Sequence, residues 1–136
     1  MVMIPNAPRL GDMPSGEPVP EAVYEIRCDK AEFKISKSDK HTPMAECMFT
    51  IFGPEEAEEF HGRKVFDNLM LAGEGAFRTR QLLTETGETD DFVLEDTDQL
   101  VGRECKGVIQ IEKERKDPST GQLYPARNKI ARYMAL

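Results

Sequence analysis

The residues with the clearest potential for chemistry are cations grouped in and around two irregular segments, SKSDKHTP at 36–43 and KDPSTGQLYPAR at 116–127. Ammonium and guanidinium groups bind phosphate oxygens, and an aromatic ring in an irregular segment can stack on a base. The residues that we predict to bind nucleic acid are Lys37, Lys40, Lys113, Arg115, Lys116, Tyr124, Arg127, Lys129 and Arg132. The competing interpretation is an ordinary charged hairpin surface, since 32% of the chain is charged.

Signatures of catalysis or metal binding are weak. His41 and His61 lie in turn-like sequence, and the chain contains no P-loop, HExxH or GxSxG motif. Cys28, Cys47 and Cys105 are widely spaced within apolar stretches, and no CxxC spacing supports a zinc site. We therefore expect buried free thiols, no metal, no cofactor and no enzymatic activity.

Composition is typical of one folded domain of 136 residues, of which 39% are hydrophobic. No apolar run approaches the roughly 20 residues needed to span a membrane. The start MVMIPNAPRL lacks the pattern of a signal peptide, so we expect a cytoplasmic protein. The net charge of −7 is unevenly distributed, because residues 54–102 carry 13 acids and four bases, whereas 103–136 carry eight bases and four acids. Phosphate binding requires local positive charge, which the second segment supplies.

Residues 1–20 contain five prolines, which disfavour both helices and paired strands. We interpret them as a flexible arm, followed by a domain over 21–136. The arm can become ordered against a partner or a neighbouring subunit, so the sequence is compatible with a homo-oligomer.

Hydrophobic alternation predicts five strands, and one helix lies between the third and the fourth. The expected strands cover 23–35, 44–52, 63–71, 104–115 and 128–135, and the helix covers 76–86. A phase slip at 29–30 predicts a β-bulge. A short helical excursion is expected before residue 60, and 116–127 is expected to be a long turn.

This β-β-β-α-β-β order predicts an all-β fold with one helix, a five-stranded OB-fold-like barrel. Closing the sheet into a barrel would also hide its edges. Such barrels bind a ligand across strands two and three, between the loop joining strands one and two and the loop joining strands four and five. The alternative architecture is an open β-sandwich with a helix packed at one end.

Several short motifs resemble a family of phage proteins. They are YEI at 24–26, SKS at 36–38, GRKVFD at 62–67, QLL at 81–83, LVGR at 100–103 and RNKI at 127–130. The family, catalogued as a phage domain of unknown function, looks like OB-fold single-stranded DNA-binding proteins of phage replication and recombination. The resemblance implies largely sequence-independent binding of single-stranded DNA in the host cell cytoplasm. It implies a phage recombinase, nuclease or helicase as partners, and it favours Lys37, Lys40, Arg127 and Lys129.

A protein-interaction module is the competing hypothesis. Residues 88–98 contain six acids and no base. An acidic surface of this kind could bind a host or phage protein, or could mimic nucleic acid, although a solvated loop is the simpler interpretation. The basic segment near the C-terminus favours nucleic acid instead, and the choice between DNA and RNA stays open.

Overall fold

The computed structural model describes residues 1–7, 17–36 and 41–136. Its longest strand is β1 (Ala22–Ile35), which pairs antiparallel with both β2 (Pro43–Gly53) and β4 (Glu104–Glu112). The bulge predicted at 29–30 is confirmed, because the register with β2 shifts between Cys28 and Lys30. A bulge bends its strand and increases the local twist, which favours curling of the sheet.

The other elements follow the predicted order, with η3, η4 and the pair β5 and β6 in addition. They are η2 (Glu55–Phe60), β3 (Lys64–Met70), η3 (Glu74–Ala76), α1 (Phe77–Glu85), η4 (Thr97–Leu100), β5 (Arg115–Lys116), β6 (Leu123–Tyr124) and β7 (Arg127–Met134). The predicted turn over 116–127 was partly wrong, because β5 and β6 pair there as a ribbon. No helix in the described part of the chain is long and apolar enough to cross a membrane.

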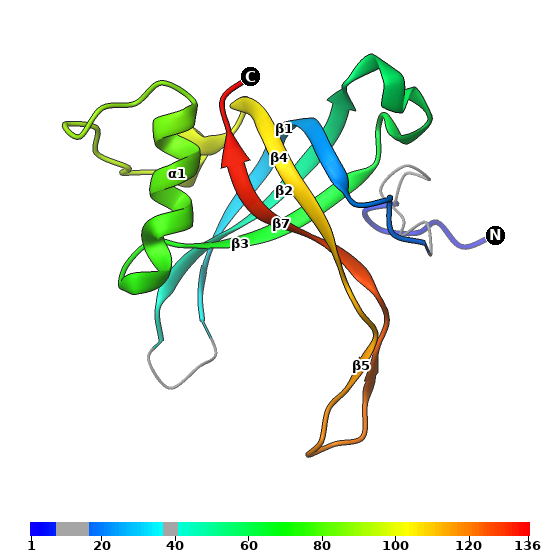
Figure 1. The fold of residues 1–136 in the computed structure, drawn as a ribbon. Coiled ribbons are helices and arrows are strands. Elements are labelled where there is room, and N and C mark those ends of the chain that lie inside the picture. Colours follow the sequence, from blue (N-terminus) through cyan, green and yellow to red (C-terminus); the bar gives the residue numbers. More distant parts are fainter. Residues whose placement is uncertain (8–16, 37–40) are drawn as a thin grey trace.

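The protein is mostly β, with a five-stranded antiparallel sheet in the order β3-β2-β1-β4-β7 and one α-helix (Figure 1). The prediction of a closed barrel was wrong. Among the described residues, no backbone ladder joins β3 to β7, the two strands at the ends of this order. The sheet is therefore curled but open.

Helix α1 explains why the sheet stays open. Three side chains of the helix each bond one backbone group of β7 or of the residue after it: Arg78 bonds the Ile130 carbonyl, Gln81 the Tyr133 N–H and Glu85 the Ala135 N–H. These helix positions are three and four residues apart, so they share one face. Side chains of α1 thus bond backbone groups that would pair with β3 in a closed barrel.

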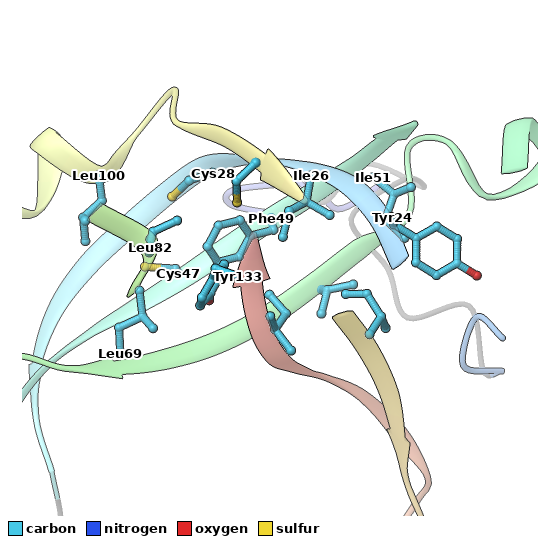
Figure 2. Close-up of a cluster of buried hydrophobic side chains, with 14 of the residues drawn as sticks. Tyr24, Ile26, Cys28, Cys47, Phe49, Ile51, Leu69, Leu82, Leu100 and Tyr133 are labelled. Atoms are coloured by element: carbon cyan, nitrogen blue, oxygen red, sulfur yellow. The ribbon is translucent and has the colours of Figure 1, made fainter. Parts of the chain in front are cut away.

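The core lies between the inner face of the sheet and α1. Figure 2 shows the rings of Phe49 and Tyr133 side by side, with Leu82 of α1 nearby, and the ring centroids are 5.7 Å apart. Ile26, Phe49, Ile51, Leu69 and Ile109 occupy alternating positions of their strands and are buried. Ile111 is only half-buried because it lies near the end of β4, where the sheet leads into the ribbon.

The three cysteines are buried free thiols, as predicted. Cys28 and Cys47 lie on the inner faces of the neighbouring strands β1 and β2 (Figure 2). Burial raises the pKa of the Cys105 thiol to about 12. These thiols contribute to the core as small apolar side chains.

Residues just before β1 pack against the sheet. Val19, which the sequence analysis assigned to the flexible arm, is buried. Its backbone N–H donates to the Asn128 side chain at 2.8 Å, and the Asn128 amide donates back to the Val19 carbonyl at 2.9 Å. The Tyr24 hydroxyl donates to the Pro20 carbonyl at 2.7 Å. The packed part of the chain therefore includes Val19.

Candidate nucleic-acid interface

The ribbon of β5 and β6 projects from the body of the domain, at the lower right of Figure 1. In its register, Arg115 lies opposite Tyr124, and Lys116 lies opposite Leu123. Side chains directly opposite each other share a face, and successive residues alternate between faces. One face of the ribbon therefore carries Arg115 and Tyr124, and the other carries Lys116 and Leu123.

Backbone and side-chain hydrogen bonds around Asp117 fix the tip of the ribbon. The Asp117 N–H donates to the Gln122 carbonyl at 2.8 Å, and Gly121 has a φ of 74°, which glycine adopts without strain. Ser119 donates to the Asp117 carboxylate through both its hydroxyl and its N–H. These hydrogen bonds lower the pKa of Asp117. The tip is thus a defined turn that sets the register of the cations.

The Arg115 guanidinium lies over the Tyr124 ring, 5.2 Å from its centroid. Arg115 and Arg127 both approach the Glu112 carboxylate, at 3.8 Å and 3.5 Å. Both arginine side chains are more than 60% exposed, and exposed ion pairs contribute little to stability. Either guanidinium can therefore exchange Glu112 for a phosphate at small cost.

Most of the residues predicted from sequence lie on one part of the molecule. Five are exposed on the ribbon or at its base: Lys113, Arg115, Lys116, Tyr124 and Arg127. Lys129 and Arg132 are also exposed, but they lie farther along β7, opposite Gln110 and Val108 of β4. The predictions for Lys37 and Lys40 fall outside the described residues.

Sequence reasoning missed the outer face of β1, β2 and β3, defined here by Lys30, Met48, Lys64, Phe66 and Asn68. In the strand register, Lys30, Met48 and Phe66 form one row across the three strands. The Phe66 side chain is 58% exposed in the middle of β3, whereas its neighbour Val65 is buried. The signal was present in the sequence, because Phe66 alternates with the buried residues of its strand.

Cations gather at one end of this outer face. The Arg27 Nε donates to the Asp29 carboxylate at 2.7 Å, and the Thr50 hydroxyl donates to the same group. The Lys64 ammonium lies 3.9 Å from Asp29 and donates to the Thr50 hydroxyl at 2.8 Å. The hydrogen bond from Arg27 lowers the pKa of Asp29. This network holds the Lys64 ammonium in place two residues before the exposed ring of Phe66.

The interface offers charge and stacking surfaces. Cations on the ribbon and on the outer face can bind phosphates, and the rings of Tyr124 and Phe66 can stack on bases. Within the described residues, no cluster of three or more His, Cys, Asp or Glu side chains is placed to hold a metal ion. The Nε2 atom of His61 lies 2.9 Å from the Pro54 carbonyl oxygen.

No protein-family model matches the chain, and no curated protein matches it. The candidate interface is therefore supported by the positions and the chemistry of its own residues.

Proposed function

We propose that this protein binds single-stranded DNA, largely independently of sequence, as an OB-fold-type protein of phage replication or recombination. The observation that carries the proposal is Phe66, whose ring is 58% exposed on the outer face, in a row with Met48 and Lys30. A large ring held in the open on a rigid strand is a stacking platform, and stacking on a base contributes about 1–3 kcal/mol.

The strand order supports the proposal. The OB-fold is a five-stranded, partly open Greek-key barrel that binds oligonucleotides on the face of its second and third strands. Here the order β3-β2-β1-β4-β7, with α1 between β3 and β4, is compatible with that fold. In the proposed fold, the ribbon would correspond to the loop between the fourth and fifth strands, and the outer face would correspond to the ligand-binding face.

In the proposed complex, bases stack on Phe66 and Tyr124, while phosphates contact the cations beside them. Lys30 and Lys64 contact the phosphates at the outer face, and Arg115 and Arg127, near Glu112, contact the phosphates at the ribbon. Stacking on a ring requires unpaired bases, so the interface favours single strands over duplex. The acidic residues of 54–102 set the overall charge of −7, and the positive charge needed for phosphates is local.

The resemblance of the sequence to phage proteins supports the biological setting, with a phage recombinase, nuclease or helicase as a proposed partner. The second candidate function is an acidic protein-interaction module. The observation that favours it is the acidic segment 88–98, which lies beside α1 and away from the ribbon (Figure 1). Both kinds of surface can exist on one molecule, because they do not overlap.

The proposal is tested by fluorescence anisotropy with labelled oligo-dT of about 16 nucleotides, the upper site size of one OB-fold. We expect oligo-dT to bind more tightly than a duplex of the same length. Phe66→Ala should weaken binding about tenfold or more, as the loss of one stacked base predicts. The matched control is Phe77→Ala, because Phe77 is 66% exposed at the start of α1, away from the proposed interface. Equal affinity of the two variants would contradict the proposal.

A further inference from the structure

A groove lies between α1 and the acidic segment. Its apolar lining residues are Met70, Leu71, Ala76, Leu83, Phe92 and Leu94. The polar groups of the lining come from Thr79, Arg80, Thr84, Glu88, Thr89 and Asp90. The volume of about 240 Å³ is below the range of roughly 300–1,000 Å³ that is typical of small-molecule pockets. A groove of this size fits one or two side chains of a protein partner.

The groove is preformed, because Arg103 ties the acidic segment to the body of the domain. The Arg103 guanidinium donates to Glu88 at 2.9 Å and to the Thr86 hydroxyl at 2.9 Å. It also lies 5.3 Å from the centroid of the Phe92 ring. The Arg103 side chain is only 13% exposed, so these contacts are largely shielded from solvent. The wall of the groove is therefore ordered before a partner binds, so binding costs little additional ordering entropy.

The charge beside the groove selects a basic partner. Residues 88–98 carry six acids and no base. Arg103 neutralises Glu88, and Arg80 lies 2.8 Å from Asp90. Asp91 and Glu95 are exposed. Both acids of the lining are thus paired, and the attraction for a cation comes from Asp91 and Glu95 beside the groove, so the complementary ligand is an apolar side chain with a cation next to it.

The ribbon carries this combination on the face opposite Arg115 and Tyr124. Leu123 is 59% exposed, and Lys116 lies directly opposite it on the same face. In Figure 1 the ribbon lies at the lower right, and α1 with the acidic segment lies at the upper left. The ribbon therefore cannot reach the groove of its own chain.

We propose that the ribbon of one copy docks into the groove of a second copy, with Leu123 in contact with the apolar lining and Lys116 facing the acidic segment. Ribbon and groove are different surfaces, so the contact is heterologous and leaves a free ribbon and a free groove at the two ends. Copies then add head to tail. The Arg115 and Tyr124 face stays outside this contact, so self-association goes beyond the proposed DNA binding and does not require it.

The test is sedimentation velocity without DNA, at about 50 mM salt, where charge screening is weak. The average mass of the wild-type protein should rise with concentration up to about 1 mM, the range of weak contacts. Leu123→Ser removes the apolar anchor, and Thr84→Arg places a cation in the groove at an exposed helix position. Each variant alone should associate at least about tenfold more weakly than the wild type.

Mixing the two variants gives the decisive readout. Leu123→Ser retains an intact groove and Thr84→Arg retains an intact ribbon, so an equimolar mixture should form 1:1 dimers that do not grow further. Tyr124→Ala, on the opposite face of the ribbon, should associate like the wild type and lose affinity only for oligo-dT. A monomeric wild type, a Thr84→Arg variant that associates normally, or a mixture that stays monomeric would each overturn the inference. These three results are obtained without DNA, so they would overturn the proposed self-association and leave the proposed DNA binding untouched.

Discussion

The hydroxyl of Tyr133 on β7 donates a hydrogen bond to the Asp67 carboxylate on β3, across the gap between the two end strands of the sheet. Arg78 of α1 forms a salt bridge with the same carboxylate. Burial raises the pKa of Tyr133 well above its usual range. Side chains thus join the two ends of the sheet where a closed barrel would have a backbone ladder.

Replacing Tyr133 by phenylalanine tests this junction. Tyr133→Phe removes one hydrogen bond to a carboxylate, which should lower the free energy of unfolding by about 1.5–3 kcal/mol in urea titrations. Tyr24→Phe is the matched control, because the buried Tyr24 donates only to a neutral carbonyl, that of Pro20. Its cost should be about 1 kcal/mol. A smaller effect at Tyr133 than at Tyr24 would contradict the account.

Loss of the arginine at the junction should be more damaging. Arg78→Met leaves Asp67, whose side chain is only 9% exposed, without its cation, and it also frees the Ile130 carbonyl. Breaking a largely buried pair from one side costs about 3–5 kcal/mol. Arg80→Met on the same helix breaks a pair whose side chains are 70% and 86% exposed, and should have little effect. Similar unfolding midpoints for the two variants would argue against a structural role for Arg78.

Local sequence patterns could not predict that the sheet stays open. Alternation predicted the strands, and Phe49 and Leu69 are buried at alternating positions of theirs. The polar helix residues Gln81 and Glu85 have the spacing of a solvated face, and no local pattern shows that they satisfy the edge of β7. Closure depends on such long-range contacts, and so the prediction of a barrel failed.

The candidate site was predictable only in part. The ribbon cations were found because proline and glycine mark the segment that carries them. Alternation placed Phe66 opposite the core but could not show that its face is left uncovered. Val19 was assigned to the arm because proline dominates its surroundings, whereas its burial depends on Asn128, far away in the sequence.

The Asp29 network makes stability depend on pH in the acid range. The hydrogen bond from Arg27 lowers the pKa of Asp29, so the folded state binds this proton less tightly than the unfolded chain does. The resulting stability is present above the unfolded pKa of about 3.9 and is lost as the pH falls through the lower folded value. Asp29→Asn should destabilise the protein at pH 7 and flatten the loss of stability below pH 4 in urea titrations. An unchanged pH profile would show that the network does not contribute.

The buried thiols should resist chemical modification. Cys28, Cys47 and Cys105 are buried, so a reagent cannot reach them in the folded protein, and burial raises the pKa of Cys105 to about 12, so this thiol carries little thiolate at neutral pH. A thiol-specific reagent should label the cysteines only after unfolding, as measured by mass spectrometry. Chelator and reductant should leave the melting temperature unchanged. A drop of several degrees in EDTA would instead indicate a structural metal.

The most direct test of DNA binding compares Arg127→Ala with Tyr124→Ala in oligo-dT titrations at several salt concentrations. If about four to six phosphates are bound, log affinity should fall against log salt with a slope of roughly −3 to −4. Arg127→Ala should flatten the slope by about 0.7, and Tyr124→Ala should cost about 1–3 kcal/mol at an almost unchanged slope. Equal and small effects of the two substitutions, or no oligo-dT binding by the wild type at low salt, would contradict the proposed interface.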